Sequence, residues 1–149
     1  MKWNCVVAVA ATLAVAASGF GSPALARSVR GGTGQALANA AATESLWHLR
    51  AGLNVAALSC RGSGREAIAP AYSRLLSRHR SLLASAYAVE QRRQGGGMDR
   101  HLTQLYNRFA MQRSPAEFCA NAAAVATEAN AMDSPTLARN AGTLLARLD

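Results

Sequence analysis

Three histidines are the side chains of this 149-residue sequence that could most readily act as ligands or proton carriers. His79 stands out because it lies on the apolar side of a predicted helix, at the spacing of one helical face. A functional histidine there would be a buried ligand or proton carrier, but a core histidine hydrogen-bonded to a tyrosine or a carbonyl is the commoner arrangement. His48 and His101 are predicted to be structural or solvent-facing. The first points away from the leucine seam of its helix, and the second lies in a first helical turn.

Acidic residues, the other common acid–base catalysts, mostly have local structural roles. Four of them lie in or beside a first helical turn, where a carboxylate stabilises the helix dipole: Glu44, Glu66, Asp99 and Glu117. Glu90 and Glu128 have no such role, but no pair of carboxylates suited to acid–base catalysis can be identified. The sequence also lacks the G-x-S-x-G, P-loop and H-E-x-x-H motifs. A binding or structural protein is therefore a better prediction than an enzyme.

A small-molecule or cofactor carrier is the second hypothesis, and its centre would be His79 in the bundle core. Covalent haem attachment needs a C-x-x-C-H motif, which is absent. Non-covalent haem would need His79 or His101 with a methionine such as Met98, Met111 or Met132 as axial ligands. Methionines at helical spacing are more often core residues. The sequence therefore predicts no resident cofactor and no metal site, and haem or a metal ion stays open only as cargo.

Arginines form the clearest surface signal, in a chain with a formal net charge of +8. On one continuous helix, Arg74, Arg78 and Arg92 would share a flank, and Arg61 and Arg65 lie in the connection before it. Such a flank could bind the phosphates of an anionic envelope polymer, lipid head groups or an acidic protein. The plainer alternative is a solvated helix face. Nucleic acid is not the expected partner, because the first 26 residues, described next, predict export from the cytoplasm.

The first 26 residues predict a cleavable secretory signal. Lys2 precedes the uncharged run 5–17, and an A-x-A sequence at residues 24–26 follows helix-breaking glycines and a proline. The apolar run is too short to span a bilayer comfortably, and an uncleaved anchor or core helix would leave the A-x-A site unexplained. We therefore predict cleavage near Ala26, a periplasmic or secreted product, and a flexible glycine-containing leader over residues 27–43.

The two cysteines beyond the signal, Cys60 and Cys119, predict one disulfide in an oxidising compartment. In the chain-entropy description, a disulfide between them would stabilise the folded protein by roughly 4 kcal/mol, because it closes a long loop in the unfolded chain. A metal site at these cysteines is less favoured, because neither has a histidine or acidic neighbour at ligand spacing.

The remaining pattern predicts an all-α fold, a single small bundle of about five helices over residues 44–149. Helical spacing covers 46–60, 66–94 and 98–112, and two further helices follow Ser114-Pro115 and Ser134-Pro135. Ser114 with Glu117 has the form of a capping box. No segment alternates apolar and polar residues as a strand would. The helix at 46–60 is apolar over more than half its circumference, so we expect it in the middle of the bundle.

The segments LWHLRAGLNVAALSC, YSRLLSRHRSLLASAYAVEQ and HLTQLYNRF, with the later pair Phe118-Cys119, resemble a family of small secreted proteins from sphingomonad-type Alphaproteobacteria. The resemblance covers about residues 46–131. It implies an exported helical domain in which Cys60 and Cys119 belong together. The family carries no known activity, so the resemblance implies no catalytic residue.

Overall fold

The computed structural model describes residues 24–62 and 66–149, and their side chains from residue 38 onward. Within these ranges all regular structure is helical, as the sequence predicts, and no strand occurs. Residues 1–23 of the predicted signal sequence lie outside the described residues. Arg65 also lies outside them. The helices are α1 (Ala24–Ser59), α2 (Ile68–Arg78), α3 (Arg80–Gln94), α4 (Met98–Ala110), α5 (Pro115–Ala131) and α6 (Ser134–Leu145), with the 3₁₀ turn η1 (Gly95–Gly97).

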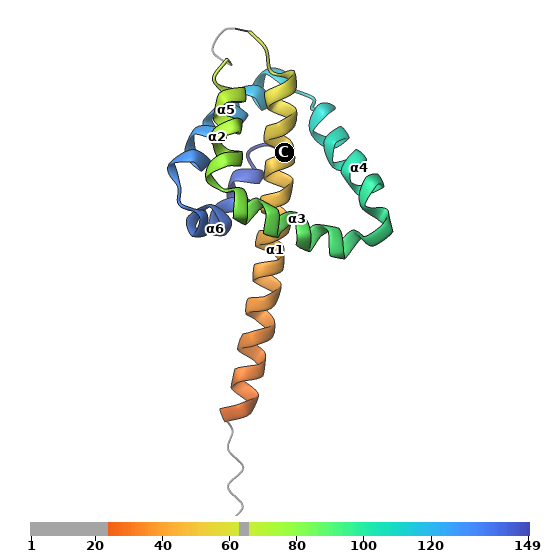
Figure 1. The fold of residues 1–149 in the computed structure, drawn as a ribbon, viewed down its shortest axis with the longest axis vertical. Coiled ribbons are helices and arrows are strands. Elements are labelled where there is room, and N and C mark those ends of the chain that lie inside the picture. Colours follow the sequence, from red (N-terminus) through yellow and green to blue (C-terminus); the bar gives the residue numbers. More distant parts are fainter. Residues whose placement is uncertain (1–23, 63–65) are drawn as a thin grey trace, which may run out of the picture.

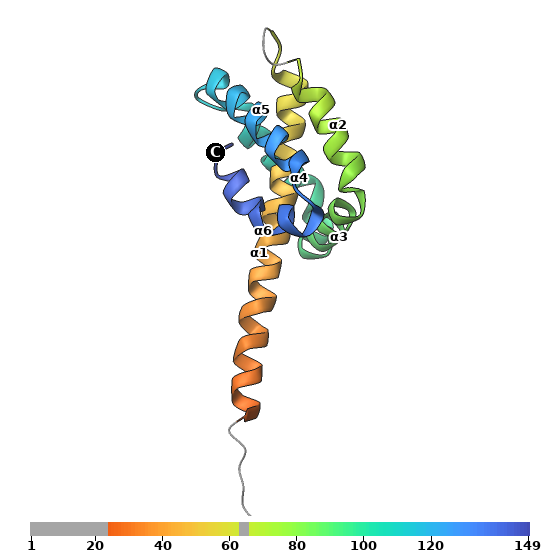
Figure 2. The ribbon, with the colours of Figure 1, turned by 90° about the vertical axis from the view of Figure 1, so that its left-hand side faces the viewer.

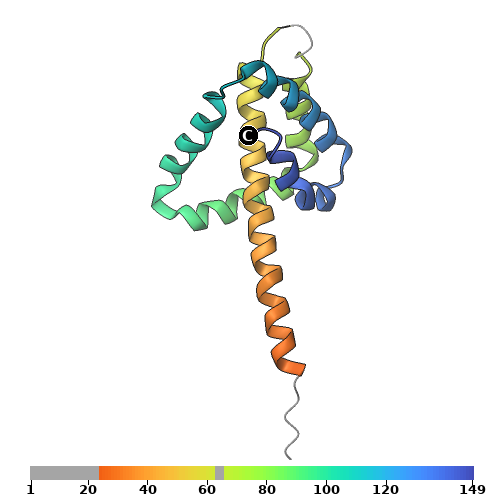
Figure 3. The same ribbon diagram turned by 180° about the vertical axis from the view of Figure 1, so that it is seen from behind.

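Helix α1 is the axis of the bundle, and the other helices gather around its C-terminal part (Figures 1 and 2). Leu49, Leu53 and Ala56 on this part are at most 1% exposed, so the helix is buried on several sides as its apolar circumference predicts. Its N-terminal part projects beyond the other helices (Figure 3). The central core helix predicted from the sequence is confirmed.

The start of α1 differs from the expected one. The sequence predicts a flexible leader over residues 27–43, whereas the structure continues the helix back to Ala24. The segment is rich in alanine, the strongest helix former, and its three glycines each weaken a helix by only about 1 kcal/mol. Among the side chains of α1 that the structure describes, from residue 38 onward, the first buried one is Leu46, near the predicted boundary.

The helix predicted over 66–94 is divided into α2 and α3 at His79. This residue has φ −109° and ψ 24°, and the chain changes direction there (Figure 1). His79 is 1% exposed, and its Nδ1 lies 2.8 Å from the Ser134 hydroxyl oxygen at the start of α6. The tertiary contact of His79 explains the corner, which no glycine or proline announces. The prediction of one straight helix here is wrong.

The two serine–proline helix starts are in the predicted places, but the serines do not cap them. Ser114 precedes α5 without a side-chain capping bond. On α6 the capping residue is Asp133, whose Oδ1 accepts a hydrogen bond of 2.8 Å from the Thr136 amide. Ser134 is one position too late to cap and pairs with His79 instead.

Cys60 and Cys119 form the predicted disulfide, with 5.6 Å between their Cα atoms. The bond joins the residue after α1 to the first turn of α5. Among the described residues, none of the helices combines the length and the hydrophobicity needed to cross a bilayer.

Candidate functional site

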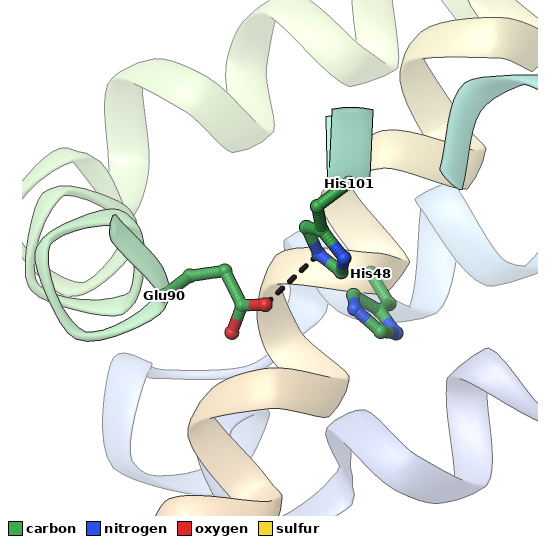
Figure 4. Close-up of side chains that lie close together, drawn as sticks. All are labelled: His48, Glu90 and His101. Carbon is green, nitrogen blue, oxygen red and sulfur yellow. Dashed lines mark ion pairs between the residues drawn. The ribbon is translucent and has the colours of Figure 1, made fainter. Parts of the chain in front are cut away.

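Three titratable side chains, one each from α1, α3 and α4, lie close together (Figure 4). We call them the His–Glu cluster. His48 comes from the middle of α1, Glu90 from the last turns of α3, and His101 from the first turn of α4. The turn η1 folds α4 back from α3, and it begins at Gly95 with φ +50°, a conformation that glycine adopts without strain. Helices α3 and α4 therefore form a V-shaped arm beside α1 that brings Glu90 and His101 together (Figure 1).

The ligand atoms of the His–Glu cluster all lie within 4.8 Å of one another. His101 Nε2 is 2.9 Å from Glu90 Oε1, and the two imidazole rings have centroids 5.5 Å apart. Glu90 is only 1% exposed, and the histidines are half-buried. His48 Nε2 is a buried atom without a hydrogen-bond partner among the described residues. His101 Nε2 and Glu90 Oε2 are also buried, and their only contacts of this kind are ion pairs, His101 with Glu90 and Glu90 with Arg93.

Neighbouring polar groups hold the cluster in place. Gln94 Nε2 donates a hydrogen bond of 2.9 Å to Glu90 Oε1. Arg93 Nη1 lies 2.7 Å from Glu44 Oε2 and 3.7 Å from Glu90 Oε2. The hydrogen bond from Arg93 lowers the pKa of Glu44, so this carboxylate stays ionised. Burial lowers the pKa of His48, which favours its neutral imidazole, the form that can bind a metal ion.

Only weak signals in the sequence point to this cluster. Glu90 stands out as an acidic residue without a local role, whereas His48 and His101 are predicted to be structural or solvent-facing. The cluster was missed because its members lie on three helices. The one usable signal is the glycine run at 95–97 between Glu90 and His101, which marks a tight helical hairpin able to bring them together.

His79, the predicted ligand of a carrier, lies elsewhere in the core. Its side chain fills the corner between α2 and α3 and contacts Ser134, and it does not belong to the His–Glu cluster. Burial lowers the pKa of His79, so the neutral ring is favoured. This arrangement agrees with the hydrogen-bonded core histidine of the sequence prediction: the Ser134 hydroxyl is one partner, and a hydrogen bond with the Ala129 backbone also acts on the ring.

The predicted arginine flank is not continuous. Arg74 and Arg78 are exposed on α2, but Arg92 belongs to α3, beyond the corner at His79. The flank prediction is wrong in this respect, because it assumed one straight helix. Arg61 is exposed in the connection after α1, and Arg65 lies outside the described residues.

Arg74 and Arg78 border a shallow hollow along α2 and α5, which we call the arginine groove. Ser73, Ser77 and Asn130 complete this part of it, and a second hollow that shares Arg74 continues between α2 and α5. The lining of the second hollow is mostly alanine, at positions 67, 71, 123, 124 and 131. Arg74 makes no hydrogen bond or ion pair among the described residues, and Arg78 Nε donates to the Met132 carbonyl at 3.3 Å.

Comparisons with known proteins find no match: no protein family, no curated protein and no solved structure is significantly similar to this chain. The resemblance to a secreted sphingomonad-type family therefore stays a prediction. The function has to be argued from the residues of the arginine groove and of the His–Glu cluster.

Proposed function

We propose that this protein is a non-enzymatic binding protein of the bacterial envelope that contacts an anionic partner through the arginine groove. The observation that carries the proposal is the pair of exposed arginines at the edge of a hollow, on a helix without a single acidic residue. Two carboxylates lie nearby: Glu128 lines the alanine-rich hollow but is paired with Arg147, and Asp133 accepts a hydrogen bond from the Thr136 amide. The guanidinium groups of Arg74 and Arg78 therefore remain available to an external anion.

The groove suits phosphate or carboxylate groups attached to a less polar body. Guanidinium groups form paired hydrogen bonds with such oxyanions, and they give up their hydration more readily than lysine does. The alanine-lined part of the groove offers a shallow apolar surface next to Arg74. Both an acidic envelope polymer and the head groups of anionic lipids carry this chemistry.

An envelope location is part of the same proposal. Its support is the predicted secretory signal, together with the Cys60–Cys119 disulfide, a bond that persists in oxidising compartments. A soluble export product with a net positive charge would meet anionic lipids and polymers there.

The test compares two double variants that remove the same charge. The first variant, Arg74→Ala with Arg78→Ala, removes both arginines of the arginine groove. The second, Arg80→Ala with Arg92→Ala, removes two exposed arginines of α3. We expect the native protein to sediment with phosphatidylglycerol vesicles or to bind soluble polyphosphate, and high salt to weaken the binding. The groove variant should lose binding and the α3 variant should keep most of it.

The two probes distinguish a lipid from a polymer as the source of the anion. Equal weakening in both variants would mean that total charge, not the groove, attracts the partner. Binding to neither probe by the native protein would contradict the proposal.

The carrier hypothesis centred on His79 gains no support from the geometry. His79 lies in a helix corner with its Nδ1 directed at Ser134, and it lines neither part of the arginine groove.

A further inference from the structure

We propose that His48, Glu90 and His101 form a binding site for a divalent transition-metal ion, with Zn²⁺ as the representative. The His–Glu cluster is separate from the arginine groove, so this proposal holds or fails independently of the one above. No sequence motif announces the site, and it exists only because α1, α3 and α4 meet beside it (Figure 4).

The first support is distance. Zinc ligands lie about 2.0 to 2.2 Å from the ion, so in a tetrahedral site the ligand atoms are about 3.4 Å apart. The three ligand atoms of the cluster already lie within 4.8 Å of one another. Binding would require side-chain torsion changes of His48 and His101 that close the remaining gap.

The second support is the set of buried polar atoms that are poorly satisfied. An unsatisfied buried polar atom destabilises the fold, and proteins rarely keep several poorly satisfied polar atoms in one place. The ion pair between His101 and Glu90 accounts for His101 Nε2, but His48 Nε2 has no partner among the described residues and Glu90 Oε2 has only Arg93, 3.7 Å away. A bound cation would satisfy the two imidazole nitrogens and the carboxylate together.

The third support is charge. Glu44 and Glu90 carry two negative charges, and Arg93, which contacts both, carries one positive charge. Arg108 also acts on His48, but it is paired with Asp149, so the neighbourhood retains one negative charge when both imidazoles are neutral. Gln94 holds Glu90 Oε1 from outside the cluster, as the groups behind metal ligands commonly do.

The donor set selects the class of metal. Two imidazole nitrogens and one carboxylate oxygen suit Zn²⁺ and the neighbouring first-row divalent ions. Mg²⁺ and Ca²⁺ prefer a shell made of oxygen atoms, and Cu⁺ prefers sulfur, whereas the three ligands of the cluster are two imidazoles and a carboxylate. Three protein ligands leave the fourth tetrahedral position for water or an external ligand.

The experiment is a calorimetric titration of the metal-free protein with Zn²⁺, repeated with Mg²⁺. We expect one Zn²⁺ per chain and no binding of Mg²⁺. His48→Ala, His101→Ala and Glu90→Gln should each weaken Zn²⁺ binding by about 100-fold or more, and Gln94→Ala should weaken it by about 10-fold to 100-fold. Co²⁺ provides a spectroscopic signature, because an intense visible absorption indicates a four-coordinate site.

The matched control is His79→Gln, which removes the third histidine of the chain and should leave the affinity for Zn²⁺ unchanged. Circular dichroism checks that each variant is folded. A second measurement needs no variant: in the ¹⁵N-labelled native protein, Zn²⁺ should shift the imidazole nitrogens of His48 and His101 and leave those of His79 in place. Absence of Zn²⁺ binding, or a shift of His79 alone, would overturn the proposal.

Discussion

His79 and Glu90 are the two buried polar residues of the described chain, and each is about 1% exposed. Helical spacing places His79 on an apolar face, and its burial follows from that spacing. The same reasoning leaves Glu90 unexplained, because the groups it contacts on α4 and α1 cannot be read from the sequence of α3. A residue's burial was thus predictable where it depends on its own helix, and its partners were not.

Burial of His79 should make stability depend on pH. Its pKa is lowered in the folded protein, so the unfolded chain binds more protons around the ordinary histidine pKa of about 6.5. The free energy of unfolding should therefore fall as the pH falls below about 6.5. Urea unfolding between about pH 7.5 and about pH 5.5, in the presence of a chelator, should show a smaller decrease for His79→Gln. His48, whose pKa is also lowered, should preserve part of the slope. An identical slope in protein and variant would contradict this explanation.

Gly52 on α1 should not tolerate alanine, although alanine favours helices. A Cβ atom there would lie 2.9 Å from Leu148 Cδ1 and 3.1 Å from Phe109 Cε1. Overpacking of this kind costs about 1 to 3 kcal/mol, against a gain in helix propensity of about 1 kcal/mol, so we expect net destabilisation of about 1 kcal/mol. Gly142→Ala is the control: its Cβ would meet Ser45 Oγ at 3.6 Å, an ordinary contact, and should stabilise α6. Urea unfolding measures the stability of both variants. Stabilisation by Gly52→Ala would show that Leu148 and Phe109 can move to make room for the added methyl group.

At the scale of helices, the sequence predicted the type and most of the boundaries. The disulfide, the central position of α1 and the starts of α5 and α6 agree with the structure. The corner at His79 was missed because it depends on Ser134 of α6, 55 residues away. The N-terminal extension of α1 is not predicted by the sequence, because the glycines of this segment disfavour a helix while the alanines around them favour one. Local patterns find helices, but contacts between helices decide where they bend.

The cap of α6 gives a test at this scale. Asp133 accepts the Thr136 amide and lies at the helix start, where a negative charge is favourable. Asp133→Ala should lower the midpoint of thermal unfolding, and Asp133→Asn, which keeps an acceptor oxygen, should lower it less. Scanning calorimetry measures both midpoints. Equal losses would mean that the charge matters and the hydrogen bond does not.

At the scale of the whole molecule, both proposed sites depend on packing between helices. The arginine groove lies along α2 and α5, and the His–Glu cluster needs α1, α3 and α4. Their residues were visible in the sequence, but not their grouping. The arginines could be grouped in part because Arg74 and Arg78 lie one turn apart, whereas His48 is 42 residues from Glu90 and no periodicity links them.

The disulfide should contribute much of the stability of this small bundle. It joins residues separated by 59 positions, and the chain-entropy description assigns about 4 kcal/mol to a loop of this size. The double variant Cys60→Ala, Cys119→Ala should lose about this amount in urea unfolding. Reduction of the native protein should give the same loss and should leave the variant unchanged. A loss on reduction that also occurs in the variant would point to an effect unrelated to this bond.

Of the described helices, α6 makes the most extensive contact with α1. These two helices are the last and the first that the structure describes. Leu137, Ala141 and Leu144 form the buried side of α6. A growing chain therefore leaves this side of α1 uncovered until α6 has been synthesised. The last large part of the core can then close only late. Such late closure would help to keep a polypeptide unfolded while it is transported across a membrane.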